Sequence, residues 1–478
     1  MRDVRLLSND RARGFRMFPF IAVTLIAATS AGCADETQNL TDPLTAAANA
    51  RAGTDVLAAN AIVVSNPAEL VAALSPANAG SHIRLLAGDY NVTGPLTVPD
   101  HATLEGEGVM LFDGSGLPTG FAAGSRTTLT MTANTPGNVL TLGNDVTVRG
   151  IAIQDLPGRV GNSIAIVSRN AGDQVFATIT EVEINSPNAH TVAPTGPAGC
   201  GVAAWTQNPN LGSAPAPHAG SEIGSRVTRS LIRSSQTGTG CGLFAFNFSP
   251  LSTVSIELAG NVVGGGMIAS GGVSRPDAVH DSRTEIQSHR NLYRNDSPDH
   301  CVPQRLGWNL QGGSGVPAPL QISATERNVL LINSVNDRIE GFTTGVMAAG
   351  GRRFFGSPTA GPTNDNRAEL ELIGTTIATP SCGGASFVAD FRLFGATASG
   401  TSLIPGDGNT LRAVMRGVTG SGTRANVYGD VVGSAGPLDP AFQGTGNRLE
   451  IPGNLKAFTQ TNQAIAPAPA LEFFTSGK

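Results

Sequence analysis

The segment Val279 to His300, VHDSRTEIQSHRNLYRNDSPDH, concentrates side chains that can do chemistry. It contains three of the seven histidines of a chain of 478 residues, of which only 14% are charged. Histidine is the usual general base near neutral pH, and arginine binds carboxylates through a planar fork of donors. Such a row can bind an anionic sugar and abstract a proton from it. The candidate bases are His289 and His280, and the candidate carboxylate ligands are Arg290 and Arg283.

Two other interpretations of this segment stay open. Residues on the solvent-facing side of a β-strand are ordinarily polar or charged, so this row can equally be a solvated surface without a function. The other alternative is a metal site, with Asp277, Asp281 and His280 as ligands. No cofactor is certain, and Ca²⁺ is possible.

Further substrate-binding candidates lie outside or beside this row. Trp205 and Trp308 are the two tryptophans, and each lies in a Gly/Pro-rich stretch that predicts a loop. A loop tryptophan can stack on a sugar ring, or it can pack the loop onto the scaffold. Arg353, in GGRRFFGS, can join a binding wall or lie over an aromatic ring. Glu285 belongs to the same outward row as Arg283.

Composition indicates a turn-rich β protein. The chain contains 60 glycines and 30 prolines, which favour turns and are poorly tolerated inside helices. Its hydrophobic content of 40% argues against disorder. The formal net charge of −5 offers no polycationic face and gives no support to nucleic-acid binding.

A repeated spacing predicts the element that must position these side chains. Two small or apolar residues two apart are followed by a three-residue step and a second such pair, which is typical of a strand, a corner and another strand. Such corners at intervals of roughly 25 to 50 residues predict a solenoid of stacked coils. The copies are Val146, Val148, Ile151, Ile153; Ala177, Ile179, Val182, Ile184; Ser225, Val227, Ser230, Ile232; Ile256, Leu258, Asn261, Val263; Ile286, Ser288, Asn291, Tyr293; Ser323, Thr325, Asn328, Leu330; and Leu370, Leu372, Thr375, Ile377.

The register assigns a direction to each side chain. Asn261, Asn291 and Asn328 are expected at the same corner of three successive copies, where stacked amides can hydrogen-bond from coil to coil. Asn291 is thus placed inside the solenoid, whereas Arg283 and His289 project outward.

The start of the solenoid resembles that of pectin-lyase-like right-handed parallel β-helix proteins. SNPAELVAAL, residues 65–74, predicts a short capping helix with a proline in its first turn. The first coil has the form G-x-x-I-x-L-x-x-G-x-Y. Its matching residues are Gly80, Ile83, Leu85, Gly88 and Tyr90.

The resemblance implies an all-β fold, a right-handed parallel β-helix over residues 61–445 with long outward loops. Residues 446–478 are expected to form a C-terminal cap or tail. The family includes lyases, hydrolases, epimerases and non-enzymatic adhesins. Its local catalytic signatures are missing from this sequence, so the family's catalytic residues cannot be assigned to any position here.

The N-terminus predicts export. An arginine-rich start is followed by an uncharged run of about 16 residues, which suits a signal peptide and is short for a membrane span. The run ends at Ala31-Gly32-Cys33, which resembles a bacterial lipobox except that Ser30 replaces the preferred leucine. We expect a signal peptide over residues 1–33, lipidation of Cys33, and a flexible tether over residues 34–60.

Lipidation predicts attachment to a membrane of the bacterial cell envelope, as an outer-membrane lipoprotein or at the cell surface. The alternative is an ordinary signal peptide and a secreted protein. Four further cysteines permit two disulfides in three connectivities, or free buried thiols. They are Cys200, Cys241, Cys301 and Cys382.

We therefore expect an exported β-helix surface protein that binds glycan or another envelope component. The alternative is a polysaccharide-degrading enzyme, a lyase rather than a hydrolase, that acts on an acidic polysaccharide.

Overall fold

The computed structural model describes most of residues 61–450. The gaps within this range are residues 189–190, 194–195, 207–218, 235–239, 275–277, 298, 302–304, 316–323, 354–362, 383–387, 399–405, 421–424 and 429–447. The expected signal peptide, Cys33 and the tether lie outside the described residues, as does nearly all of the expected C-terminal cap. In the described part of the chain, no helix is long and apolar enough to cross a membrane.

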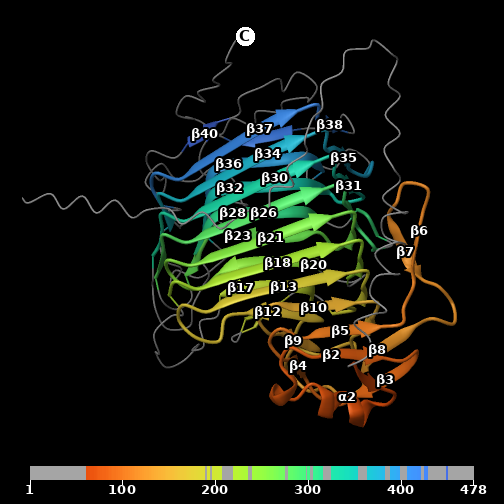
Figure 1. Cartoon of the computed structure of the whole chain (residues 1–478). Coiled ribbons are helices and arrows are strands. Elements are labelled where there is room, and N and C mark those ends of the chain that lie inside the picture. Colours follow the sequence, from red (N-terminus) through yellow and green to blue (C-terminus); the bar gives the residue numbers. More distant parts are fainter. Residues whose placement is uncertain are drawn as a thin grey trace, which may run out of the picture. The chain divides into compact units, whose positions relative to one another are not determined.

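Three parallel sheets form the body of the protein, and their strands alternate along the chain (Figure 1). Sheet 1 contains β1 (Ile62–Val64), β2 (His82–Leu85), β5 (Thr103–Gly106), β10 (Val146–Arg149), β13 (Gln174–Thr180), β18 (Glu222–Thr228), β21 (Thr253–Ala259), β26 (Arg283–His289), β30 (Val329–Val335), β34 (Arg367–Ile373), β37 (Thr410–Arg416) and β40 (Arg448–Glu450). Sheet 2 contains β3 (Gly88–Val92), β8 (Thr127–Met131), β11 (Ala152–Gln154), β14 (Glu183–Asn185), β19 (Leu231–Arg233), β22 (Val262–Gly264), β27 (Leu292–Arg294), β31 (Arg338–Glu340), β35 (Thr376–Ala378) and β38 (Thr419–Gly420). Sheet 3 contains β4 (Leu96–Val98), β9 (Leu140–Leu142), β12 (Ile164–Val167), β17 (Cys200–Thr206), β20 (Cys241–Asn247), β23 (Met267–Ser270), β28 (Leu306–Gly315), β32 (Thr344–Arg353), β36 (Ala389–Ala398) and β39 (Ala425–Tyr428).

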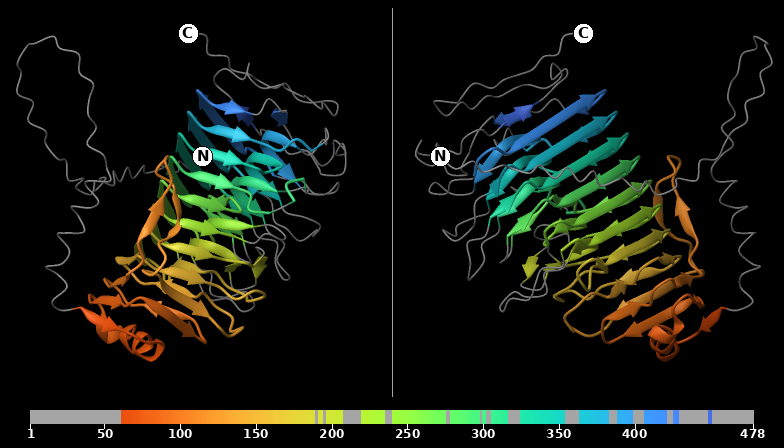
Figure 2. Two further views of the ribbon diagram at one scale, coloured as in Figure 1. Left: turned by 90° about the vertical axis from the view of Figure 1, so that its right-hand side faces the viewer. Right: turned by 60° about the vertical axis from the view of Figure 1, so that its left-hand side comes forward.

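A few elements lie outside these sheets. They are the helix α2 (Pro67–Ala73), the 3₁₀ turn η2 (Pro76–Asn78), the hairpin of β6 (Met110–Phe112) and β7 (Pro118–Phe121), the hairpin of β15 (Thr191–Ala193) and β16 (Gly196–Ala198), the strand β24 (Val273–Ser274), and a small parallel sheet of β25 (Val279–His280), β29 (Thr325–Glu326) and β33 (Thr363–Asn364). The hairpin β6–β7 lies along the outside of sheet 2 (Figures 1 and 2), where Leu117 packs against Leu231 and Val262.

Each coil runs from sheet 1 through sheet 2 to sheet 3 and back to sheet 1 (Figure 2). A single residue with positive φ makes the corner from sheet 1 to sheet 2; examples are Glu181, Arg229, Arg290 and Asn336, with φ between 51° and 57°. The next side chain then points inward again. This stacking is that of a right-handed parallel β-helix, so the predicted fold class is confirmed.

The side chains that fill the interior are those at the inward positions of the predicted repeat. The inward residues of six copies are all in the core or buried beside it, from Val146 to Ile153 at one end and from Leu370 to Ile377 at the other. Ile286, Ser288, Asn291 and Tyr293 are buried as predicted, whereas Arg283 and His289 lie on the outside. Strand alternation therefore separates core from wall along sheet 1.

The asparagines form two ladders. Asn261 and Asn291 lie at the same corner, where Nδ2 of Asn261 donates to Oδ1 of Asn291 over 2.8 Å. The next member of this ladder is Asp337, which accepts from Nδ2 of Asn291 over 3.1 Å. The expected third member, Asn328, belongs elsewhere.

Asn328 lies at the opposite end of the sheet 1 strands, so its predicted register was wrong. Its Nδ2 donates to Oδ1 of Asn366 over 3.0 Å, and Asn366 donates in the same way to Asn409 over 3.1 Å. Both corners use a positive-φ residue followed by an inward polar side chain, here Arg327 before Asn328. Because the spacing of inward residues is the same at both corners, the sequence pattern alone could not show which corner Asn328 occupies.

The first coil is closed by the predicted helix. Asn66 caps α2 by accepting a hydrogen bond from the backbone N–H of Glu69 over 3.0 Å, and Pro67 occupies the first turn. Leu70 and Ala73 are buried against the core. Tyr90 is also buried, and its hydroxyl donates to the backbone carbonyl of Val64 over 2.7 Å.

The four cysteines form two disulfides, Cys200–Cys241 and Cys301–Cys382, which resolves the connectivity. Cys200 and Cys241 are register partners on neighbouring strands, with Cα atoms 4.6 Å apart. That separation matches the spacing of adjacent strands, so the disulfide links two neighbouring coils covalently. Disulfides of this kind are typical of extracellular proteins.

Candidate functional site

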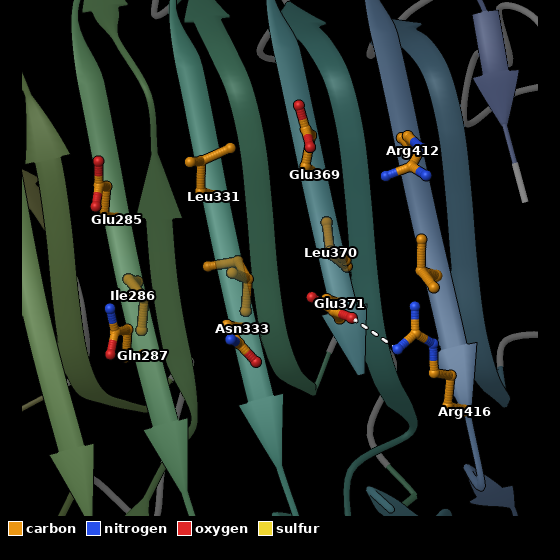
Figure 3. A pocket seen from close by; sticks show the side chains of 12 residues that line it. Glu285, Ile286, Gln287, Leu331, Asn333, Glu369, Leu370, Glu371, Arg412 and Arg416 are labelled. Carbon is orange, nitrogen blue, oxygen red and sulfur yellow. Dashed lines mark ion pairs between the residues drawn. The ribbon is translucent and has the colours of Figure 1, made fainter. Parts of the chain in front are cut away.

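A groove of about 400 Å³ runs across the outer face of sheet 1. Its floor is formed by β26, β30, β34 and β37, and the side chains project from the sheet (Figure 3). The outward residues that line it are Glu285, Gln287, Leu331, Asn333, Glu369, Glu371, Arg412, Val414 and Arg416. The groove therefore combines carboxylates, amides and guanidinium groups with two aliphatic side chains.

Parallel register brings these residues together. Glu285, Leu331, Glu369 and Arg412 are successive partners across the four strands. Gln287, Asn333, Glu371 and Val414 form a second row two residues further along. Neighbouring strands are about 4.8 Å apart, so each row presents one side chain per coil along the axis of the β-helix.

Ion pairs hold most of the charges of the groove. Glu285 pairs with Arg283 on its own strand, and Glu369 pairs with Arg367 over 2.5 Å. Glu371 lies 3.6 Å from Arg416, as Figure 3 shows. Because each carboxylate already has a cationic partner, the groove is close to neutral and is best suited to hydrogen bonding.

The predicted catalytic residues do not converge on one point. Arg283 and His289 are the first and last residues of β26, and their Cα atoms are therefore about 20 Å apart. The register partners of His289 on the two adjacent strands are Ala259 and Val335, and neither is acidic. Arg290 is exposed and makes the corner itself, with φ 54°.

His280 lies at the other corner, in a network of its own. Its Nδ1 atom is 2.9 Å from Oδ2 of Asp281, and Arg327 donates two hydrogen bonds to the same carboxylate over 2.9 and 2.8 Å. These hydrogen bonds from Arg327 lower the pKa of Asp281 to about 2. The network links two coils, and it lies far from His289.

The candidate metal site finds no support in this geometry. Within the described ranges, no three histidine, cysteine, aspartate or glutamate side chains are grouped so that they could hold an ion. Both oxygens of Asp281 are engaged by Arg327, and Asp277 lies outside the described residues. The donors that the structure shows do not fit Ca²⁺, which takes six to eight oxygen ligands.

Both tryptophans lie in strands, and neither is available to stack on a sugar. Trp308 is in β28, is 0% exposed, and packs inside the β-helix with its ring edge-on to Tyr293, the ring centroids 5.2 Å apart. Trp205 is in β17 and is buried in an apolar cluster with Phe244 and Phe246. The Gly/Pro-rich context of both tryptophans predicted loops, but this prediction was wrong. In sheet 3 the glycines lie within strands, where neighbouring coils approach closely.

Arg353 is the last residue of β32, and its side chain lies outside the described part of the molecule. Of the predicted binding residues whose side chains the structure describes, Glu285 alone lines the groove. The remaining groove residues were missed, although Glu369 and Glu371 occupy outward positions two apart in a recognised copy of the repeat. The alternation of inward and outward residues in that copy could have predicted that both glutamates face outward.

Comparisons with known proteins give little further information. No family model matches the chain, and no curated protein matches it. A solved structure that is similar is the catalytic unit of a thermostable GH87 alpha-1,3-glucanase from Streptomyces thermodiastaticus strain HF3-3, at 12% sequence identity and a TM-score of 0.26. The match covers 79% of this chain and 64% of that one. A likeness at this level carries no conclusion about activity.

Proposed function

We propose that this protein is an exported, lipid-anchored envelope protein that binds a glycan through the outer face of sheet 1. The observation that carries the proposal is the groove over β26, β30, β34 and β37, lined in register by amides, carboxylates and guanidinium groups. Sugars present many hydroxyl groups, each of which donates and accepts hydrogen bonds, and such side chains satisfy both roles.

The same groove is a poor candidate for glycosidic-bond cleavage. Two carboxylates of opposite role are needed, one of which must carry a proton to act as general acid. Glu285, Glu369 and Glu371 are each held in an ion pair with an arginine, so none of the three is placed as a separate acid or base beside a glycosidic bond. Binding is therefore the function that this geometry supports better than hydrolysis.

The alternative is lyase activity on an acidic polysaccharide, with His289 as the base. Proton abstraction beside a uronate requires the base and a cation that holds the carboxylate near one another. Arg283 is at the far end of β26 from His289, and Arg290 is at the corner. The distance of Arg283 leaves Arg290, the residue after His289, as the remaining cation for a lyase, which the experiment below tests in the same samples.

The experiment uses the full-length protein and a panel of neutral and acidic polysaccharides. Binding is measured by affinity electrophoresis, and turnover by reducing ends and by ultraviolet absorbance of unsaturated products, with and without calcium. We expect binding without turnover. Asn333→Ala is expected to weaken binding, whereas Asn91→Ala, which changes an exposed asparagine of sheet 2, is the matched control.

Two results would contradict the proposal. One is the absence of binding to every polysaccharide, and the other is turnover that requires His289. The anchor has its own test: Cys33→Ala is expected to release the protein from membranes. A variant that stays with the membrane would refute lipidation and leave the glycan site untouched.

A further inference from the structure

An aromatic side chain lies exposed on the same outer face as the groove. Phe176 is in β13 and is 45% exposed, although its neighbours Val175 and Ala177 are buried in the core. The other large apolar side chains that are exposed in the described residues are aliphatic. Phe176 therefore presents an aromatic ring to solvent on the outer face of sheet 1.

The neighbouring strand is shaped to receive this ring. The register partner of Phe176 on β18 is Gly224. A Cβ atom at Gly224 would lie 2.5 Å from Cδ2 of Phe176, so the ring occupies the space that a side chain at this position would need. The phenyl group therefore lies over Gly224 and remains partly exposed.

Phe176 belongs to the same row as the groove. Successive register partners run from Phe176 through Gly224 and Ser255 to Glu285, and then through Leu331 and Glu369 to Arg412. This row crosses seven strands of sheet 1. At about 4.8 Å per strand it extends about 29 Å along the axis. The residues between the ring and the groove, Gly224 and Ser255, are both small.

We infer that Phe176 is a stacking platform at the far end of an extended binding row, and that the ligand is a long, uncharged polysaccharide aligned with the axis of the β-helix. A sugar ring has apolar C–H faces that stack on an aromatic ring, and hydroxyl groups at its edge that suit the amides and carboxylates of the groove. This inference rests on the proposed glycan-binding function.

The charges of the row point to an uncharged polymer. Three carboxylates, Glu285, Glu369 and Glu371, face the groove, and two arginines, Arg412 and Arg416, face it from β37. Because Arg283, Arg367 and Arg416 pair with these carboxylates, the groove carries little net charge with which to attract a polyanion. Hydroxyl groups do not depend on such an attraction.

The test compares short and long ligands. Full-length protein is titrated with neutral probes (laminarin, dextran and xylan), each as the polymer and as its trisaccharide fraction, and with alginate and pectate as acidic probes. Phe176→Ala is expected to weaken binding of the neutral polymer about tenfold, which corresponds to the loss of one aromatic stacking contact. It should leave trisaccharide binding in the groove unchanged, and Phe176→Trp should retain polymer binding.

Two further variants separate the possible failures. Asn333→Ala is expected to weaken binding of both ligand lengths, and Val71→Ala, which changes a side chain 57% exposed on α2, should alter neither. If Asn333→Ala acts but Phe176→Ala has no effect on polymer binding, the platform is wrong and the groove stands. If neither variant has an effect, the glycan site itself is wrong. Tighter binding of alginate or pectate than of any neutral polymer would overturn the uncharged ligand.

Discussion

The side-chain amide of Asn291 donates a hydrogen bond to Oδ1 of Asp337 over 3.1 Å inside the β-helix. Asp337 thus occupies an asparagine position of the ladder as a carboxylate that is 0% exposed. It also accepts from the backbone N–H of Asn291 over 2.7 Å and from the hydroxyl of Ser334 over 2.7 Å. Desolvation nevertheless outweighs these hydrogen bonds and raises the pKa of Asp337 above its ordinary value.

Asp337→Asn is expected to stabilise the protein at neutral pH. Because the raised pKa means that folding disfavours the ionised carboxyl, the stability present at low pH is lost as the pH rises through that pKa. Asparagine removes this loss, and a gain of about 1 kcal/mol would raise the melting temperature by about 1–2 °C in a body of this size. The check is thermal unfolding between pH 4 and 8, with the exposed Asp89→Asn as control. An unchanged pH profile in Asp337→Asn would contradict this account.

Asn366→Ala is expected to destabilise the second ladder. Asn366 is buried, and its Oδ1 accepts from both the backbone N–H and Nδ2 of Asn328, each over 3.0 Å. Alanine leaves these donors without a partner at a cost of about 2–4 kcal/mol. Denaturant unfolding measures the loss. Asn333→Ala, on the exposed face of the neighbouring coil, should leave the unfolding midpoint in place, and equal losses for the two variants would argue against the ladder.

Arg159→Met is expected to destabilise the connection between β11 and β12. Arg159 and Asp155 form an ion pair whose side chains are both 0% exposed, and Nη2 of Arg159 donates to Oδ2 of Asp155 over 2.7 Å. Removal of the cation leaves a buried carboxylate without its partner, which lowers the free energy of unfolding by about 3–5 kcal/mol. The double variant Asp155→Leu, Arg159→Met should recover much of the loss in thermal unfolding. A double variant no more stable than Arg159→Met would show that the carboxylate is not the cause.

Cys200→Ala with Cys241→Ala is expected to lower stability by about 4 kcal/mol, because the bond closes a segment of 41 residues in the unfolded chain. Chemical unfolding of the oxidised protein and of the double variant measures the difference. Thiol titration of the unfolded, unreduced protein provides the control, since all four cysteines should be unreactive. Reactive thiols at these positions would contradict the pairing.

The predicted catalytic residues are neighbours in the sequence but do not all lie together in the fold. His280, His289 and Arg290 are close in sequence, yet one corner and the whole of β26 separate His280 from the other two. Ten residues of extended chain span about 30 Å, so proximity in sequence is not proximity in space along a strand. Stacking instead joins Glu285 to Glu369 across 84 positions of the chain through two register steps.

The sequence alone determined the inward positions of the coils, the capping helix and the β-helix itself, because side-chain alternation and corner geometry are local properties. Only the tertiary structure decided which corner holds Asn328, which cysteines pair, and that Trp308 lies inside the core. It also decided that the groove and Phe176 share one row. These depend on the register between coils, which is set by the lengths of the intervening loops and by the packing of whole coils on one another.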